Sequence, residues 1–240
     1  MTPLEYFNFS SDGEGWDLHL PSEIHGAFGG VTGGALAAAS IALSRTAEPT
    51  RLATGIDIHF LKGLATTQAR ATVTTLTSGR SLTIVRVEFS DASGIPTTEA
   101  HVALAASEAL RIDIEASERK QGLLGPPPKD LSDRAKPWRK PEGVKVPIID
   151  TARPQAARMG SAIATLVTVP WNPSADGSEG ACLAADLSVG PPVDAALPKD
   201  RWVPHPNPDL SLRFVDRVTA NDLIAIGTCR EISRGFATVE

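Results

Sequence analysis

Asp186 is the residue of this sequence whose position most clearly favours chemistry. It lies near the end of the run Glu179–Leu187, whose small and apolar residues predict a short buried helix. It is the only carboxylate in the body of either small-residue helix of the chain. Burial disfavours the ionised form and raises the pKa, so an interior aspartate beside a water molecule can act as a general base. The alternative is that Asp186 reaches solvent at the helix C-terminus, near Gly190.

Gly29 and Gly30 are a second chemical feature, because they stand at the predicted start of a helix running from Gly29 to Ser44. The first N–H groups of a helix have no partner within it, and the helix dipole favours negative charge there. Donors at such a point bind a carbonyl oxygen more strongly as it becomes an oxyanion during attack. The alternative is that both glycines only permit close packing of the helix on a sheet.

Other reactive side chains lack the partners that catalysis would require. His25 precedes the glycine-rich segment and is predicted to be a turn residue, and His59 alternates within a strand as a packed or surface ring. Ser40 is not in a Gly-x-Ser-x-Gly setting, which argues against a serine hydrolase. Cys182 and Cys229 lack CxxC spacing and are predicted to be buried free thiols. We expect no metal site.

The elements that position these groups follow from hydrophobic patterning. From Val31 to Leu43 apolar residues cover every face at helical spacing, which is typical of a helix inside a fold. Its small residues allow a curved sheet to wrap closely around it. Turn signals at 77–80 and 91–94 predict an antiparallel meander among the following strands. Strands rich in Thr, Val and Ile are expected at 16–20, 52–60, 69–76, 82–89 and 97–104.

Composition divides the chain into two modules. Residues 1–112 are the predicted N-terminal domain, the charged and proline-rich residues 113–145 a linker, and residues 146–240 the C-terminal domain. The second half begins again with 146–151 and 162–169 before it reaches the small-residue run.

An internal duplication is predicted from residues that recur at one offset. Phe60 and Arg80 recur as Phe214 and Arg234, each 154 residues later. At this offset the counterpart of the last strand of the first module falls beyond Glu240. The second module is therefore predicted to lack that strand and, unless a partner or a further segment covers the edge, to have an unpaired sheet edge.

Charge and hydropathy exclude several partners. The net charge of -5 gives no electrostatic reason to bind nucleic acid. The uncharged stretch 24–44 contains five glycines and is too polar for a bilayer span. The N-terminus lacks the basic and apolar regions of an export signal, so we expect a cytoplasmic protein.

Three segments carry a resemblance to a known family: Phe28–Leu36 (FGGVTGGAL), Ile58–Lys62 (IHFLK) and Thr75–Arg80 (TLTSGR). In this order they resemble the acyl-CoA thioesterase II type of double hotdog. The resemblance implies an α+β fold with two hotdog modules side by side, each an antiparallel β-sheet wrapped around a central helix. It further implies one extended sheet layer, an acyl tunnel between the modules and a homo-oligomer.

The same resemblance implies a reaction and its residues. The family hydrolyses fatty or related acyl-CoAs to free acid and CoA, with the CoA thioester as substrate and no further cofactor. An Asp in the second module's helix, a Thr before the following strand and a Gln in the final strand jointly hold the water. Asp186 matches the first, Asn207 falls where the family has Thr, and the Gln belongs to the strand that this chain lacks. An amide can still hydrogen-bond the water. Gly29 and Gly30 are expected to polarise the carbonyl.

Several residues are weaker candidates for substrate contact. Lys62, Arg80 and Arg86 are cations that could meet CoA phosphates, although scattered surface cations are usual. Trp138 and Trp202, in proline-flanked loops, are predicted to line or cover an acyl tunnel, or simply to pack.

Two alternative functions stay open. The first is a non-catalytic acyl or acyl-CoA binding module that kept the fold and lost part of the water-holding trio. The second is a hotdog hydratase with His25 as base, for which the acidic partner and the His-Gly-Asp type of motif are not seen.

Overall fold

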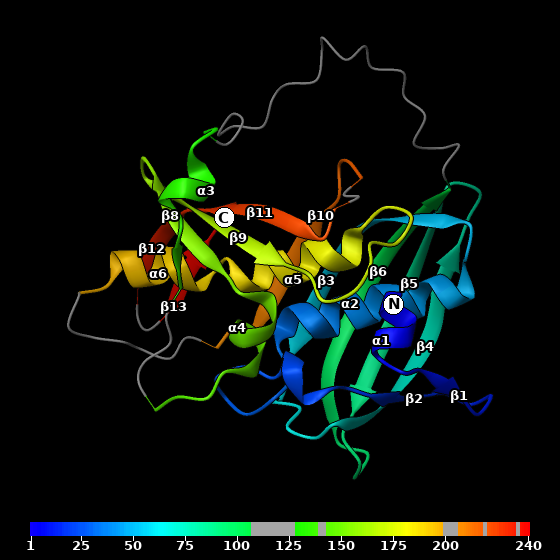
Figure 1. Ribbon diagram of the computed structural model, residues 1–240. Helices are drawn as coiled ribbons and strands as arrows, with labels where there is room; N and C mark the ends of the chain where they lie inside the picture. Colours follow the sequence, from blue (N-terminus) through cyan, green and yellow to red (C-terminus); the bar gives the residue numbers. More distant parts are fainter. Residues whose placement is uncertain (107–127, 139–142, 199–205, 218–219, 234–235) are drawn as a thin grey trace.

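The computed structural model describes residues 1–106, 128–138, 143–198, 206–217, 220–233 and 236–240. A curved antiparallel sheet wraps around a long helix, and a second group of strands and helices packs beside it (Figure 1). Trp202, Arg234 and residues 113–127 of the predicted linker lie outside the described residues.

The first module is a hotdog built on helix α2 (Gly33–Ala47). Every residue from Gly34 to Ser44 is buried, as the apolar pattern predicts. The order of the large sheet is β1-β2-β4-β5-β6-β3-β10, with every pairing antiparallel. The first six strands in chain order are β1 (Ser10–Ser11), β2 (Trp16–His19), β3 (Arg51–Phe60), β4 (Gln68–Ser78), β5 (Leu82–Ser90) and β6 (Pro96–Ala106). The predicted strands of this module and its meander are confirmed.

The predicted start of the central helix is wrong by four residues. Gly29 has a φ of +74°, a left-handed conformation that does not continue into a helix, and Thr32 is extended. The backbone N–H of Gly26 donates to the carbonyl of Gly30 at 2.8 Å, which closes a loop before the helix. The helix begins at Gly33, so Gly29 and Gly30 belong to this loop.

The second module contains helix α5 (Ser178–Leu187), which coincides with the predicted small-residue helix. Of the residues 146–151 predicted to open this module, 147–151 lie in helix α4 and Val146 is its N-cap; Pro147 stands in the first turn, where a proline is tolerated. The module boundaries at 112 and 145 stay predictions. The predicted linker contains α3 (Leu131–Arg134) and β7 (Lys136–Pro137). The other elements after it are α4 (Pro147–Ala152), β8 (Gln155–Met159), β9 (Ala162–Thr168), α6 (Gly190–Ala196), β10 (Asp209–Arg213), β11 (Asp222–Gly227), β12 (Cys229–Ser233) and β13 (Phe236–Val239). Two short N-terminal elements, α1 (Pro3–Tyr6) and the 3-10 helix η1 (Ser22–Ile24), cover the first module.

In the pairing of β3 with β10, two residues at equivalent positions of the predicted duplication lie opposite each other. Asp57 is the direct partner of Ser211 in this ladder, and the Ser211 hydroxyl donates to the Asp57 carboxylate at 2.7 Å. These two positions are separated by the repeat offset of 154 residues. Equivalent strands of the two modules therefore pair about a local two-fold axis, as in a symmetric dimer.

The sheets form one layer only in part. Strand β10 extends the first module's sheet, whereas β11, β9, β8 and β7 form a separate four-stranded sheet. Strand β3 is flanked by both β6 and β10, but β10 has β3 as its only neighbour in the described part of the chain. This agrees with the predicted absence of a counterpart to β6. Strands β12 and β13 form a third, two-stranded sheet, so the described strands lie in three separate sheets.

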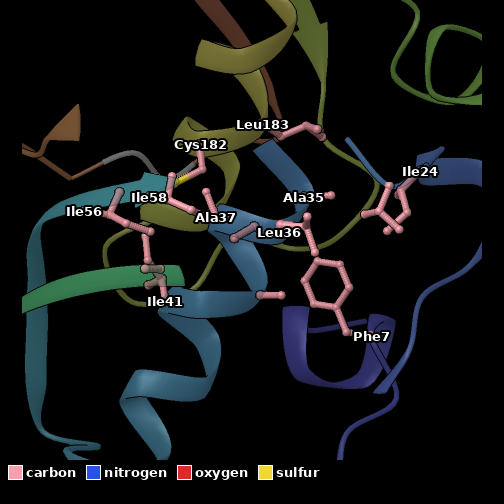
Figure 2. Packing of buried hydrophobic residues seen from close by; sticks show 14 of the residues in the cluster. Phe7, Ile24, Ala35, Leu36, Ala37, Ile41, Ile56, Ile58, Cys182 and Leu183 are labelled. Atoms are coloured by element: carbon pink, nitrogen blue, oxygen red, sulfur yellow. The ribbon is translucent and has the colours of Figure 1, made fainter. Parts of the chain in front are cut away.

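Helices α2 and α5 pack at very short range where the modules meet. A Cβ atom at Gly34 would lie 2.7 Å from the Cys182 carbonyl oxygen and 2.8 Å from the Leu183 Cα. Figure 2 shows Cys182 and Leu183 beside Ala35 and Ala37 of α2. Only glycine permits this approach, so Gly34 sets the distance between the two helices.

A buried ionic cluster holds the other end of the same helix pair. Arg45, in the last turn of α2, forms ion pairs with Asp176 and Glu179, and its guanidinium donates to the Ser178 hydroxyl at 2.8 Å. Asp176 also accepts from the backbone N–H of Ala53 in β3 at 2.9 Å. Burial raises the pKa of Glu179 in spite of the nearby Arg45 charge. The cluster therefore fixes the start of α5 to α2 and to the sheet.

Replacing Gly34 with alanine is expected to destabilise the protein. The added methyl would meet backbone atoms of α5, which cannot rotate away, and such overpacking lowers the free energy of unfolding by about 1–3 kcal/mol. Chemical denaturation of Gly34→Ala measures the change. Gly63→Ala is the matched control because a Cβ there meets open space. Equal stability of the two variants would contradict the close helix contact.

Candidate active site

A cavity of about 400 Å³ lies where the two modules meet. Its lining combines the loop before α2 and the start of that helix with α4, the end of α5 and the residues before β10. Most of the wall is apolar, with Leu36, Leu64, Ile148 and Leu187 among the contributing side chains. Such a hollow with a few polar groups is the usual form of a small-molecule site.

Asp186 is the carboxylate of this cavity. It stands in the last turn of α5 and its Oδ1 lies 3.3 Å from where a Cβ of Gly33 would be. Burial raises the pKa of Asp186, while hydrogen bonds from the Gly34 N–H and the Asn207 side chain act in the opposite direction. The carboxylate therefore faces the N-terminus of α2, a position that supports the predicted role as a base.

Asn207 is held against this carboxylate, as the predicted pairing of the two residues requires. Its Nδ2 donates to Asp186 Oδ1 at 2.7 Å. The backbone beside it is fixed because the N–H of Phe60, the last residue of β3, donates to the Pro208 carbonyl at 2.9 Å. Asn207 therefore enters the cavity at the point where β10 joins the sheet.

The start of α2 supplies the polar groups next to Asp186. The N–H of Gly33, the first helical residue, has no partner within the helix. The ring of Phe60 lies so close that a Cβ at Gly33 would be 2.6 Å from its Cζ. Thr32, at the N-cap, makes no side-chain capping bond, and its buried hydroxyl has no hydrogen-bond partner among the described residues. Thr32, Gly33 and Phe60 all line the cavity.

Of the two glycines predicted to bind the carbonyl, Gly30 lies at the cavity and Gly29 does not. The N–H of Gly29 instead donates to the Gly26 carbonyl at 3.3 Å, within the loop. The prediction that both glycines present N–H groups at the helix N-terminus is wrong, because the helix starts at Gly33.

Of the three cations predicted to bind CoA, only Lys62 lines the cavity. Its half-exposed ammonium pairs with Asp91 at 3.1 Å. Arg80 is exposed in the hairpin after β4, and Arg86 pairs with Glu88 on the surface of β5. Neither arginine lines this cavity.

The histidine, serine and cysteine side chains that the sequence analysis judged unsuited to catalysis do not line the cavity. His25 Nδ1 contacts the Gly29 carbonyl at 3.3 Å, and His59 is exposed on β3. The Ser40 hydroxyl donates to the Leu36 carbonyl within α2. Cys182 and Cys229 are free thiols, the first buried and the second half-buried. Where the chain is described, no cluster of three or more His, Cys, Asp or Glu is placed to hold a metal.

Sequence reasoning missed Thr32 and Phe60 as cavity residues. Thr32 stands inside the glycine-rich segment Gly-Gly-Val-Thr-Gly-Gly, so its small polar side chain between two glycine pairs was an available signal. Phe60 appeared as a marker of the repeat and within the segment Ile58–Lys62 that carries the family resemblance, but not as a site residue. Its contact with Gly33 depends on the tertiary fold, which no local pattern encodes.

The fold and the site together define a double hotdog protein. Residues 19–107 match the family model of the acyl-CoA thioesterase N-terminal domain. Comparison with curated protein sequences gives no significant match.

Solved structures agree with this fold over nearly the whole chain. A candidate thioesterase II from Thermobifida fusca has a TM-score of 0.73 and 16% identity, with 99% of this chain and 89% of that chain covered. A hotdog protein of unknown function from Alicyclobacillus acidocaldarius gives 0.71 and 16%, with 98% and 88% covered. An acyl-CoA thioesterase II, TesB2, from Mycobacterium marinum gives 0.67 and 15%, with 99% and 88% covered. At these identities the likeness establishes the fold, and the resemblance to the thioesterase II type of double hotdog is confirmed.

Loss of the Asn207 amide is expected to raise the pKa of Asp186 further. The hydrogen bond from Asn207 stabilises the ionised carboxylate, so Asn207→Ala removes an interaction that now lowers this pKa. Carboxyl ¹³C NMR titration measures the shift, with the signal assigned through Asp186→Asn. Asn221→Ala is the control, since that amide binds the carbonyls of Val169 and Trp171 instead. An unchanged or lower pKa in Asn207→Ala would contradict the pairing.

Proposed function

We propose that this protein hydrolyses acyl-CoA thioesters to the free acid and CoA, with Asp186 activating the water. The observation that carries the proposal is the position of Asp186 in an apolar cavity, beside the N-terminus of α2 and bonded by Asn207. Burial supports it further, because the raised pKa makes Asp186 a stronger proton acceptor than an exposed aspartate. The family match over residues 19–107 adds independent support.

The proposed reaction begins with a water molecule between Asp186 and the thioester. Asp186 takes a proton as the water oxygen bonds to the carbonyl carbon, and the carbonyl oxygen becomes an oxyanion. The carbon–sulfur bond then breaks, and the CoA sulfur takes the proton back from Asp186. Asn207 orients the carboxylate throughout, which is the part of the family's Thr role that an amide can perform.

The oxyanion is assigned to the first turn of α2. The Gly33 N–H has no partner within the helix, Gly33 lines the cavity, and the positive end of the helix dipole lies there. The unpartnered Thr32 hydroxyl lies on the same wall and offers a second donor. Gly30 stays a candidate for a third. The donor site is thus moved from the predicted Gly29–Gly30 pair toward Gly33.

Lys62 is the predicted cation that the cavity lining supports as a contact for CoA phosphate. It stands just after β3, and its ammonium is partly exposed.

Among the helices of the described residues, none has the length and apolar character needed to cross a bilayer. A cytoplasmic location and a homo-oligomer stay predictions.

A non-catalytic acyl-CoA binding protein is the second candidate. It is favoured by one observation: β10 has no second neighbour in the described residues, so the strand that carries the family's Gln is not seen there. Saturable acyl-CoA binding without release of free CoA would select this alternative.

Replacing Asp186 with asparagine is expected to reduce hydrolysis at least tenfold, because a general base contributes roughly 10²–10⁴-fold to rate. Thiol release from a series of acyl-CoAs, followed with a thiol reagent, measures the effect. Asp222→Asn is the matched control, since that carboxylate accepts from Thr168 on an exposed part of β11. Unchanged hydrolysis by Asp186→Asn would remove Asp186 from the mechanism.

Thermal unfolding of Asp186→Asn distinguishes loss of the catalytic group from misfolding of the variant. The pKa of Asp186 is raised by folding, so the stability of the native protein falls as the pH rises through that pKa. At neutral pH the uncharged asparagine avoids this cost, and Asp186→Asn should unfold at a temperature no lower than the native protein does. The difference should shrink as the pH falls below the ordinary aspartate range.

A further inference from the structure

Trp138 occupies a fixed place on the cavity wall although it comes from the segment predicted to be a linker. It follows β7, whose residues Lys136 and Pro137 pair with Ala156 and Gln155 of β8. Its backbone N–H donates to the Pro154 carbonyl at 2.9 Å. The main chain is therefore tied to the second module's sheet where the indole begins.

The indole itself is held by α6. Its Nε1–H donates to Asp194 Oδ2 at 2.9 Å. A Cβ at Gly190 would lie 2.4 Å from the Trp138 Cζ2 atom, so the ring lies directly on the glycine at the start of the helix. Gly190 and Asp194 are four residues apart and share one helix face. The ring is thus clamped at its edge and at its nitrogen.

Two hollows meet at this ring. Trp138 lines the cavity of Asp186, and it also lines a second hollow of about 550 Å³ formed with Pro137, Arg153 and Gln155. Ile149 of α4 is the other residue shared by both linings. The indole and the Ile149 side chain are therefore the partition between the site cavity and the outer hollow.

We propose that Trp138 is a specificity-determining residue that ends the acyl-binding part of the cavity and so limits the length of the acyl chain. This inference rests on the proposed function for the identity of the ligand. The cavity of about 400 Å³ holds a short or medium acyl chain beside the thioester, and the outer hollow would hold further methylene groups if the partition were removed. A fixed aromatic wall sets this limit without any moving lid.

The proposed limit on acyl-chain length can be measured as the dependence of acyl-CoA affinity on chain length. Each additional methylene buried in an apolar site raises affinity by about fourfold, until the chain reaches a wall. Affinity for saturated acyl-CoAs should therefore rise with chain length and then stop rising at one length. In Trp138→Ala the chain continues into the outer hollow, and the rise should extend by at least two methylenes, a gain of roughly 16-fold for the longer chains.

The experiment is calorimetric titration with saturated acyl-CoAs from butanoyl to hexadecanoyl, in an Asp186→Asn background that slows turnover. Trp138→Phe keeps the partition and loses only the bond to Asp194, so it should keep the native length limit. Val189→Ala is the size control, because Val189 lines the site cavity and not the outer hollow. Trp138→Leu replaces the alanine variant if the latter does not fold.

The outcomes separate this inference from the proposed function. An unchanged length limit in Trp138→Ala or Trp138→Leu overturns the inference, even if the native protein hydrolyses acyl-CoA. An equal extension in Val189→Ala also overturns it, because general enlargement would then explain the effect. Length-limited binding that Trp138→Ala extends, without thiol release by the native protein, supports the inference and rejects the hydrolase.

Discussion

The site depends on one contact, the close approach of α2 to α5 at Gly34. Because this residue has no side chain, the backbone of α5 at Cys182 and Leu183 can lie against the first turn of α2. The same approach brings Asp186, one helical turn further along α5, to the N–H groups at the start of α2. The close contact of the two helices at this point places the carboxylate beside the donors on the opposite helix. The ionic cluster around Arg45 holds the other end of the pair.

The local two-fold axis between Asp57 and Ser211 relates two modules whose central helices differ at the cavity. α2 carries no carboxylate and contributes helix-terminal donors, whereas α5 carries Asp186. The first module closes its sheet around α2 with a full set of strands. In the second module, the described strands leave β10 without a second neighbour. The asymmetry leaves one cavity with an acid from one module facing donors from the other.

Much of the first module could be predicted from sequence because its signals are local. An all-apolar helix, strands rich in Val, Thr and Ile, and Gly-containing turns each encode their own conformation. The same local rules misplaced the helix start, because the loop before the helix is held by tertiary hydrogen bonds, from the Thr32 N–H to the Ile24 carbonyl and from the Val31 N–H to the Leu64 carbonyl. The helix α4 was likewise missed where a short apolar run looked like the start of a repeat.

The residues of the candidate site likewise fall into those that the sequence predicts and those that only the tertiary fold reveals. Asp186 and Asn207 were predicted, the first as an interior acid and the second from the family resemblance, and they form a 2.7 Å hydrogen bond. Thr32, Gly33 and Phe60 were not assigned to the site, because their roles arise only where β3, β10 and both helices converge. The place of Trp138 between two hollows likewise depends on α6, which lies far from it in the sequence.

A crystal structure of Asp186→Asn with a bound acyl-CoA tests the proposed site most directly. The thioester carbonyl is expected within hydrogen-bond distance of the Gly33 N–H, with a water molecule between residue 186 and the carbonyl carbon. A thioester bound away from residue 186, or an acyl chain outside the cavity that both modules line, would contradict it.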